Sequence, residues 1–193
     1  MLTQIANYLL HTLITLYLGC LLLRLLLQWC RADFYNPISQ FVIKATHPLV
    51  GPVRRVIPAI GRVDTATLLL LIGLEVVAIA LLCLINYGAL PLLSVALWAP
   101  IGIASLLVHF YFLLLIVMIV LSWVAPFSRH PAALLVWQLC EPVMAPLRKV
   151  IPPLGGLDIS PIFLFIGINV LTIVLNHAAA AVGLVPLLVP GFY

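Results

Sequence analysis

Charged residues are the scarcest class in this sequence of 193 residues. Asp, Glu, Lys and Arg together make up 7% of it, whereas 65% of the residues are hydrophobic. An average globular chain carries about 25% charged residues, because water-exposed surface needs them. The composition therefore excludes a soluble globular protein and indicates a chain whose outer surface faces lipid.

Motifs for catalysis and metal binding are missing as well. The four cysteines form no C-x-x-C pair, and the chain has no glycine-rich phosphate loop, no carboxylate pair and no Ser, His and Asp in triad order. We expect the cysteines to be packing residues. The sequence predicts a protein that is not an enzyme and holds no metal ion.

Four apolar stretches are long enough to cross roughly 30 Å of hydrocarbon at about 1.5 Å per helical residue. They are residues 5–29, 65–86, 101–124 and 161–176. Strands with open edges would leave unpaired backbone groups in lipid, so these stretches must be helices. We predict an all-α integral membrane fold with four transmembrane helices. Residues 87–100 should form a link in the outer interface, kinked by Pro91 and Pro100.

The chain contains an internal repeat. The segment HPLVGPVRRVIPAIGRVD at residues 47–64 returns in diverged form as EPVMAPLRKVIPPLGGLD at residues 141–158, and Pro58 is 94 residues from its counterpart Pro152. Each copy includes two predicted spans, so the copies should be parallel and related by an axis along the membrane normal. We divide the chain into repeats at residues 1–94 and 95–193.

The cations give the orientation. All nine Lys and Arg residues lie in the two segments that connect the spans within each repeat, or beside them, with Arg24 near the end of the first span. The positive-inside rule then places both repeated segments in the cytoplasm and both termini in the periplasm of a bacterial inner membrane. We expect Arg24 to extend its side chain to the headgroups. The net positive charge is explained by the orientation in the membrane, so we predict no nucleic acid partner.

Each repeated segment should begin with a short amphipathic helix on the membrane surface. In the first copy Asn36 and Pro37 have the sequence of a helix start, and Ile38, Phe41, Val42 and Ala45 share the apolar face. Prolines then obstruct a continuous helix, so we expect short turns with fixed kinks. The residues that set these turns are Pro48, Pro52, Pro58 and Gly61 in the first copy, and Pro142, Pro146, Pro152 and Gly155 in the second.

Each repeated segment also carries two neighbouring basic residues and an acid. They are Arg54, Arg55 and Asp64 in the first copy and Arg148, Lys149 and Asp158 in the second. The turns could hold each arginine against the aspartate, within a repeat or across the two repeats. Three roles fit: a structural clamp, docking of a partner protein, or binding of an anionic ligand or lipid phosphate, since a guanidinium bonds carboxylates and phosphates alike.

Glu75 is the one acid in a predicted span. It lies near the bilayer midplane, where a carboxyl group must be neutral, hydrogen-bonded or in a wet cavity. Its repeat partner is Asn169, so we expect a hydrogen bond between Glu75 and Asn169 across the repeat interface. A proton or cation relay is the alternative.

The repeated motif resembles the YggT/YlmG family of small membrane proteins. The likeness rests on a tryptophan at the helix end, Asn-Pro, the run P-x-x-x-P-x-R-(R/K)-x-I-P, and Gly and Asp before the next helix. It covers nearly the whole chain and resembles the duplicated proteobacterial inner-membrane form. The first copy departs from the pattern at His47 and at Thr65-Ala66-Thr67, which predicts a looser start for its second helix.

The resemblance links the chain to osmotic-stress tolerance, and through plastid relatives to assembly of a b-type cytochrome and to nucleoid or division organisation. It implies a non-enzymatic scaffold or assembly factor that docks other membrane or division proteins, as a monomer or homo-oligomer. One alternative is an ion or solute conduit with Glu75 in its path. Another is haem handling, for which His11, His109 and His177 are candidates, although none has a histidine at its repeat position.

Overall fold

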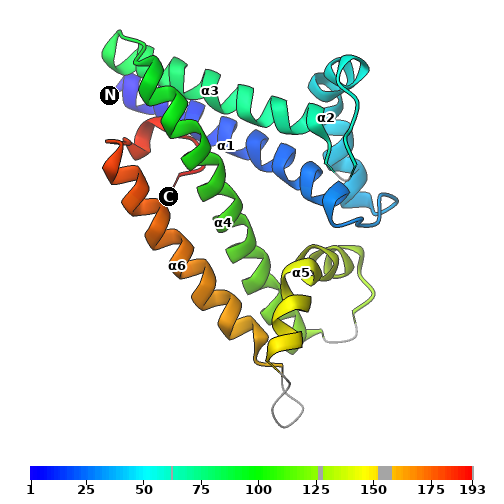
Figure 1. The fold of residues 1–193 in the computed structure, drawn as a ribbon. Coiled ribbons are helices and arrows are strands. Elements are labelled where there is room, and N and C mark those ends of the chain that lie inside the picture. Colours follow the sequence, from blue (N-terminus) through cyan, green and yellow to red (C-terminus); the bar gives the residue numbers. More distant parts are fainter. Residues whose placement is uncertain (62, 126–127, 152–157, 193) are drawn as a thin grey trace.

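The computed structural model describes residues 1–61, 63–125, 128–151 and 158–192, and within these ranges the chain is helical (Figure 1). One isolated bridge pairs Ile60 with Val63. The elements are α1 (Leu2–Trp29), α2 (Pro37–Val56), α3 (Thr65–Tyr87), α4 (Leu92–Val124), α5 (Pro131–Val150), α6 (Ser160–Ala181) and the short 3₁₀ helix η1 (Pro186–Leu188).

The four predicted spans are confirmed as α1, α3, α4 and α6, each long and apolar enough to cross a membrane. The largest difference lies before the third span. α4 begins at Leu92, because Gly88 ends α3 in a left-handed conformation and Pro100 is accommodated inside the helix. The predicted kinked link is therefore wrong: the connection is a tight turn between Tyr87 and Leu92.

α2 and α5 correct the prediction for the proline run. Pro48 and Pro52 lie inside α2, and Pro142 and Pro146 lie inside α5, without ending either helix. In each pair the prolines are four residues apart, so both lie on one exposed helix face, where carbonyl groups left without an N–H donor can bond to water. The third proline does end α2, because Ile57, which precedes Pro58, is extended.

The start of α2 matches the prediction, and a second face of the helix packs against protein. The side chain of Asn36 accepts a hydrogen bond from the amide of Ile38 at 3.0 Å, which caps the helix. The buried stripe consists of Ser39, Val42, Thr46 and Val50, while Phe41 is 66% exposed. These four residues recur at helical spacing and pack toward α1 and α3. Ile38 and Phe41, which we predicted on the face toward the membrane surface, lie outside this packed stripe.

The helices form two arms that start at the end with the termini and diverge from it (Figure 1). α1 and α3 run side by side in one arm and α4 and α6 in the other; both termini lie at one end and both α2 and α5 at the opposite end. The parallel arrangement of the repeats is confirmed. At the end with the termini, a cluster around Trp98 joins α3, α4, α6 and the C-terminal segment. Near α2 and α5, the side chain of Asn36 donates to the carbonyl of Pro131 at 2.7 Å, which ties the repeats together.

Candidate functional site

The basic pair of the first repeat lies in the last turn of α2. Arg54 and Arg55 are both exposed there, and cations at a helix C-terminus complement the helix dipole. Arg148 and Lys149 occupy the same place in α5. The two helix ends therefore carry the same charges on equivalent positions, and what differs between them is the acid that each arginine can reach.

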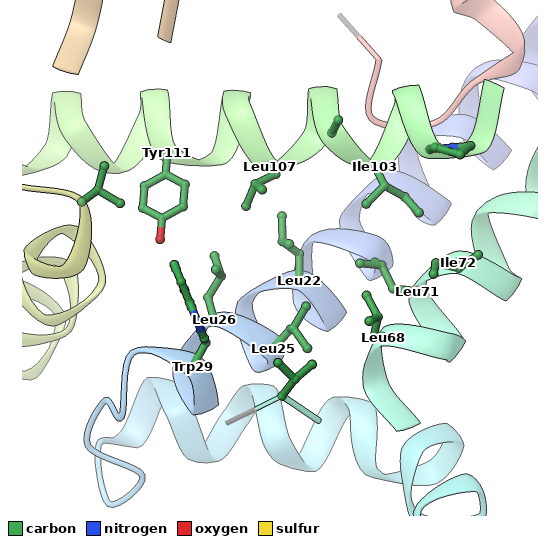
Figure 2. A pocket seen from close by; sticks show the side chains of 14 residues that line it. Leu22, Leu25, Leu26, Trp29, Leu68, Leu71, Ile72, Ile103, Leu107 and Tyr111 are labelled. Atoms are coloured by element: carbon green, nitrogen blue, oxygen red, sulfur yellow. The ribbon is translucent and has the colours of Figure 1, made fainter. Parts of the chain in front are cut away.

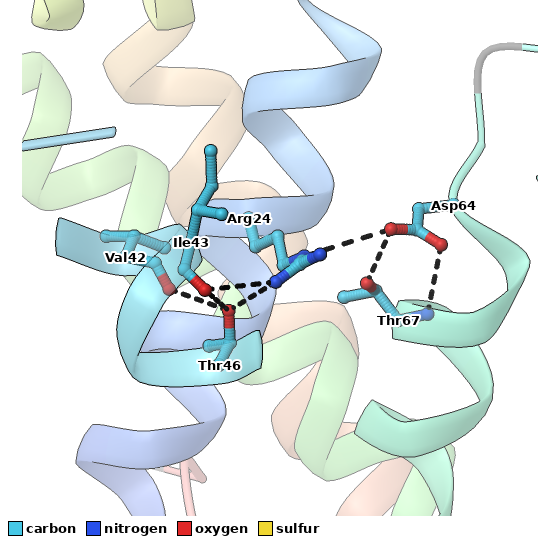
Figure 3. Close-up of polar contacts among 6 residues, drawn as sticks. All are labelled: Arg24, Val42, Ile43, Thr46, Asp64 and Thr67. Atoms are coloured by element: carbon cyan, nitrogen blue, oxygen red, sulfur yellow. Dashed lines mark hydrogen bonds and ion pairs between the residues drawn. The ribbon is translucent and has the colours of Figure 1, made fainter. Parts of the chain in front are cut away.

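Asp64 is bound by Arg24 of α1 and not by Arg54. Figure 3 shows Arg24 between α2 and the start of α3: its Nε lies 3.8 Å from Asp64 Oδ2, and its Nη1 donates to Thr46 Oγ1 at 2.8 Å and to the carbonyl of Ile43 at 3.3 Å. Arg24 is 6% exposed and Asp64 is 1% exposed. The prediction that Arg24 extends to the headgroups is wrong, because its partners lie inside the protein.

The start of α3 is held firmly by the same acid. Asp64 accepts hydrogen bonds from the amide of Thr67 at 3.4 Å and from its hydroxyl at 2.8 Å, and Thr65 donates to the carbonyl of Pro58 at 2.6 Å. These threonines are the residues at which the first copy departs from the family pattern. They bond the start of the helix directly, so the predicted looser start is wrong.

In the second repeat the arginine and the aspartate do pair. Arg148 Nε lies 2.8 Å from Asp158 Oδ2, and Arg148 Nη1 lies 2.8 Å from Glu141 Oε2. Partial burial alone would raise the pKa of Asp158, but hydrogen bonds from Ser160 and Arg148 outweigh it and lower that pKa. Burial alone would lower the pKa of Arg148, and the two carboxylates outweigh it and raise that pKa. Arg148 and Asp158 therefore pair within one repeat, which is one of the two arrangements that we predicted.

Two differences between the repeats explain this asymmetry. The residue 94 positions after Arg24 is Met118, so no buried arginine competes for Asp158. The residue equivalent to Glu141 is His47, so the first copy lacks the second carboxylate. Arg148 therefore has two acids, whereas Arg54 has neither, and the predicted pairing of Arg54 with Asp64 is wrong. The buried Asp64 also leaves the set of residues that can contact a partner.

Glu75 and Asn169 do not meet as predicted. Glu75 is fully buried, and neither of its carboxyl oxygens has a hydrogen-bond partner among the described residues. It faces Gly102 of α4, where an added Cβ would collide with the carboxyl group and with Val189. Asn169 donates to Phe165 of its own helix at 2.8 Å and lies on the exposed side of α6. Because the carboxyl group is fully buried, the structure gives an ion path through Glu75 no support.

The histidines are placed separately. His11 lies 3.3 Å from the carbonyl of Val189, His109 bonds Ser105 of its own helix, and His177 bonds the carbonyl of Ile173. Among the described residues no group of three His, Cys, Asp or Glu side chains could hold a metal ion. Of the residues that we expected to shape the turns, Pro152 and Gly155 lie outside the described residues, while Gly61 has a φ of 62° in the turn before α3.

The sequence analysis missed Arg24 and Thr46 as site residues. An arginine one turn from the end of an apolar span, with an aspartate at the start of the next, is a signal for a buried pair that we attributed to the headgroups instead. Thr46 carried no such signal, because its role depends on which face of α2 is buried.

Comparison with known proteins identifies the repeat unit. The sequence profile of the CCB3/YggT family matches residues 3–85 and again residues 97–179. An uncharacterised protein of Pseudomonas aeruginosa is 46% identical over 182 residues, covering 93% of this chain and 92% of the relative. The uncharacterised protein YggT of Escherichia coli K12 is 39% identical, covering 97% and 96%.

A plant relative matches over a shorter stretch. The YlmG homolog protein 2 of Arabidopsis thaliana, described as chloroplastic, is 37% identical over 92 residues, covering 45% of this chain and 36% of its own. No solved structure matches the chain. The two profile matches begin and end 94 residues apart, as do the paired motifs, and the bacterial relatives match almost from end to end. The chain is a multi-pass membrane protein that belongs to the CCB3/YggT family.

Proposed function

We propose that this protein is a non-enzymatic scaffold of the bacterial inner membrane that docks an acidic segment of another membrane or division protein at the basic end of α2. The docking end consists of Arg54, Arg55 and Val56. Through the family, such a scaffold is linked to osmotic-stress tolerance and to the assembly of membrane complexes. It requires no cofactor of its own.

The observation that carries the proposal is the free charge at this end. Among the residues that the structure describes, neither Arg54 nor Arg55 forms an ion pair, whereas Arg148 binds two carboxylates. Guanidinium groups bond carboxylates through two parallel hydrogen bonds, which gives a partner both affinity and a fixed orientation. Val56 is 81% exposed beside the arginines, so the end offers apolar contact as well as charge.

The second repeat supplies a matched control. Val150 is equivalent to Val56 and is 79% exposed, but Arg148 of that end is bound to two carboxylates, which leaves Lys149 as its one cation without an ion pair among the described residues. With a photoreactive amino acid at position 56 or at position 150, in native membranes, we expect discrete crosslinked products from position 56 and few from position 150. The charge reversal R54E/R55E should remove the products from position 56, and K149E should leave them unchanged.

The side of the membrane is checked with the same positions. A cysteine at position 56 or 150 in a cysteine-free background should react with a membrane-impermeant thiol reagent in inside-out vesicles and not in intact cells. Crosslinks of equal strength from both positions, or products that survive R54E/R55E, would contradict docking at the end of α2. Products that contain only a second copy of this chain would show self-association in its place.

A further inference from the structure

Two spaces between the helices differ in the side chains that line them. A cavity of about 630 Å³ between α1, α3 and α4 is lined almost entirely by apolar side chains of these helices, so it selects no particular occupant (Figure 2). A pocket of about 440 Å³ between α4, α5 and α6 has charged walls as well as apolar ones. Arg148 of α5 and Asp158, just before α6, line it together with Met118 and Trp123 of α4. This second pocket can select its occupant by charge.

The charges at this pocket do not balance. Arg148 bonds Asp158 through Nε and Glu141 through Nη1, so one cation serves two carboxylates. Within the described part of the chain, Glu141 Oε1 accepts no hydrogen bond and Arg148 Nη2 donates none. All three side chains are at least 35% exposed, so a ligand can reach them. The cluster can therefore bind one further cation, and an acceptor group beside it.

The first repeat shows which kind of group lies at the equivalent position. The residue 94 positions before Met118 is Arg24, and the counterpart of Asp158 is Asp64. Figure 3 shows the guanidinium of Arg24 between Asp64 and Thr46, 3.8 Å from the acid and donating to the Thr46 hydroxyl at 2.8 Å. A cation with N–H donors thus occupies this place in the first repeat. Met118 supplies no such cation in the second, where the pocket lies open beside Asp158.

The pocket extends from the headgroup level into the hydrocarbon. Trp123 is the residue before the end of α4 and is 85% exposed, and an indole ring at the end of a span prefers the headgroup level. Met118 lies five residues deeper in the same span, about 7.5 Å at 1.5 Å per residue. Ser122 and Trp123 are both exposed, so the pocket is accessible from the lipid side. A charged end at headgroup depth and an apolar end below it match the order of groups in a membrane lipid.

We propose that this pocket binds the headgroup of phosphatidylethanolamine. The primary ammonium donates hydrogen bonds to the carboxylates of Asp158 and Glu141, and the phosphate accepts one from Arg148 Nη2. The glycerol and the first carbons of one acyl chain lie beside Met118. A choline headgroup has no N–H donor for the carboxylates, and a glycerol headgroup brings no cation. This site is separate from the basic end of α2, so either proposal can fail without the other.

The test uses the full-length protein, delipidated in detergent, with a phosphatidylethanolamine that carries a photoreactive diazirine on one acyl chain. We expect labelling to saturate and the labelled peptides to come from the ends of α4 and α6 that line the pocket. Unlabelled phosphatidylethanolamine should compete for the site at least fivefold better than phosphatidylcholine or phosphatidylglycerol with the same acyl chains, the size of one hydrogen bond.

Three variants connect this selectivity to the pocket. E141Q removes one carboxylate from a side chain that is 55% exposed, so the fold should persist while the preference for phosphatidylethanolamine falls about fivefold. M118R supplies the cation that Arg24 provides in the first repeat and should abolish the preference. D33N removes an exposed carboxylate outside the pocket, at the same end of the molecule, and should leave the preference unchanged.

Equal competition by the three lipids would show ordinary boundary lipid and overturn the proposal. A preference for phosphatidylethanolamine that survives E141Q and M118R would place its cause elsewhere and overturn it too. The proposal also fails if a photoreactive residue at position 122, in native membranes, crosslinks a protein and no lipid attaches there, because a basic side chain of a partner would then occupy the pocket.

Discussion

Asp64 and Asp158 occupy equivalent positions in the two repeats, yet each binds a different arginine. Asp64 binds Arg24 from the neighbouring span, and Asp158 binds Arg148 from its own motif. The burial differs as well: the side chains of Arg24 and Asp64 are 7% and 1% exposed, whereas those of Arg148 and Asp158 are 35% and 40% exposed. The aspartate therefore takes part in a buried ion pair in the first repeat and in a surface ion pair in the second.

The two pairs should contribute very differently to stability. R24Q leaves the buried Asp64 without its cation, which costs about 3 to 5 kcal/mol when a buried pair is broken. R148Q removes a partly exposed arginine at the protein surface, and surface ion pairs contribute about 0 to 1 kcal/mol. We expect R24Q to lower the free energy of unfolding, followed by denaturant titration in detergent micelles, by several times as much as R148Q. Equal losses would show that Arg24 and Asp64 are not a buried pair.

Of the two ion pairs, the one between Arg148 and Asp158 could be predicted from the sequence, whereas the one between Arg24 and Asp64 could not. The spacing between Arg148 and Asp158 is short enough for contact within one motif, so that clamp followed from the repeat itself. Arg24 is forty residues from Asp64 in the sequence, and their contact depends on how α1, α2 and α3 pack. An arginine near the end of a span is as consistent with the headgroup region as with a buried acid.

The helices α2 and α5 show that the helix-breaking tendency of proline does not by itself decide where a helix ends. The prolines of α2 and α5 oppose a helix one residue at a time, but their spacing of four puts every missing donor on the same exposed face. The helix therefore persists over 20 residues in each repeat and ends before the third proline of the first motif. The presence of α2 and its capping residue could be predicted from the sequence. Its length and its buried face depend on how the helix packs on α1 and α3.

A glycine of α4 lies at the closest point of its contact with Glu75 of α3. Gly102 lies against Glu75 and Val189, which are both fully buried, and a Cβ at this position would collide with both side chains. We expect G102A to destabilise the protein by about 1 to 3 kcal/mol through overpacking. G73A is the matched control, because nothing lies within 4 Å of a Cβ at that position. It should be neutral or stabilising by up to about 1 kcal/mol, since alanine favours the helix.

Thermal unfolding of the two variants in the same detergent makes this comparison. If G102A proved as stable as G73A, the side chain of Glu75 would have room to move, and its enclosed position between α3 and α4 would be in doubt.

For the whole molecule, the number of spans and the distribution of charge were sufficient to predict the architecture. An even number of spans per repeat requires the two motifs to lie at one end, and the structure places α2 and α5 together there, opposite both termini. What the repeat could not predict is that its copies are unequal. That inequality arises from Met118 and His47. The counterpart of Met118, Arg24, binds an acid at the start of another helix, and the counterpart of His47, Glu141, binds Arg148 of its own helix.

The second repeat can be changed by mutation so that it resembles the first. Met118 lines a cavity of about 440 Å³ together with Arg148 and Asp158, so an arginine introduced at position 118 has room to reach the aspartate. The double variant M118R/E141H gives the second repeat the residues that free Arg54 in the first.

Photocrosslinking from position 150 in this double variant is the most direct test of docking through a freed arginine. We expect products from position 150 to appear, approaching the yield from position 56 in the unmodified chain, because Arg148 is released from both carboxylates. The control is that the double variant inserts and folds normally and that its introduced arginine binds Asp158. If position 150 then gives no crosslinked products, the result would contradict the claim that a partner recognises the free charge at the end of the surface helix.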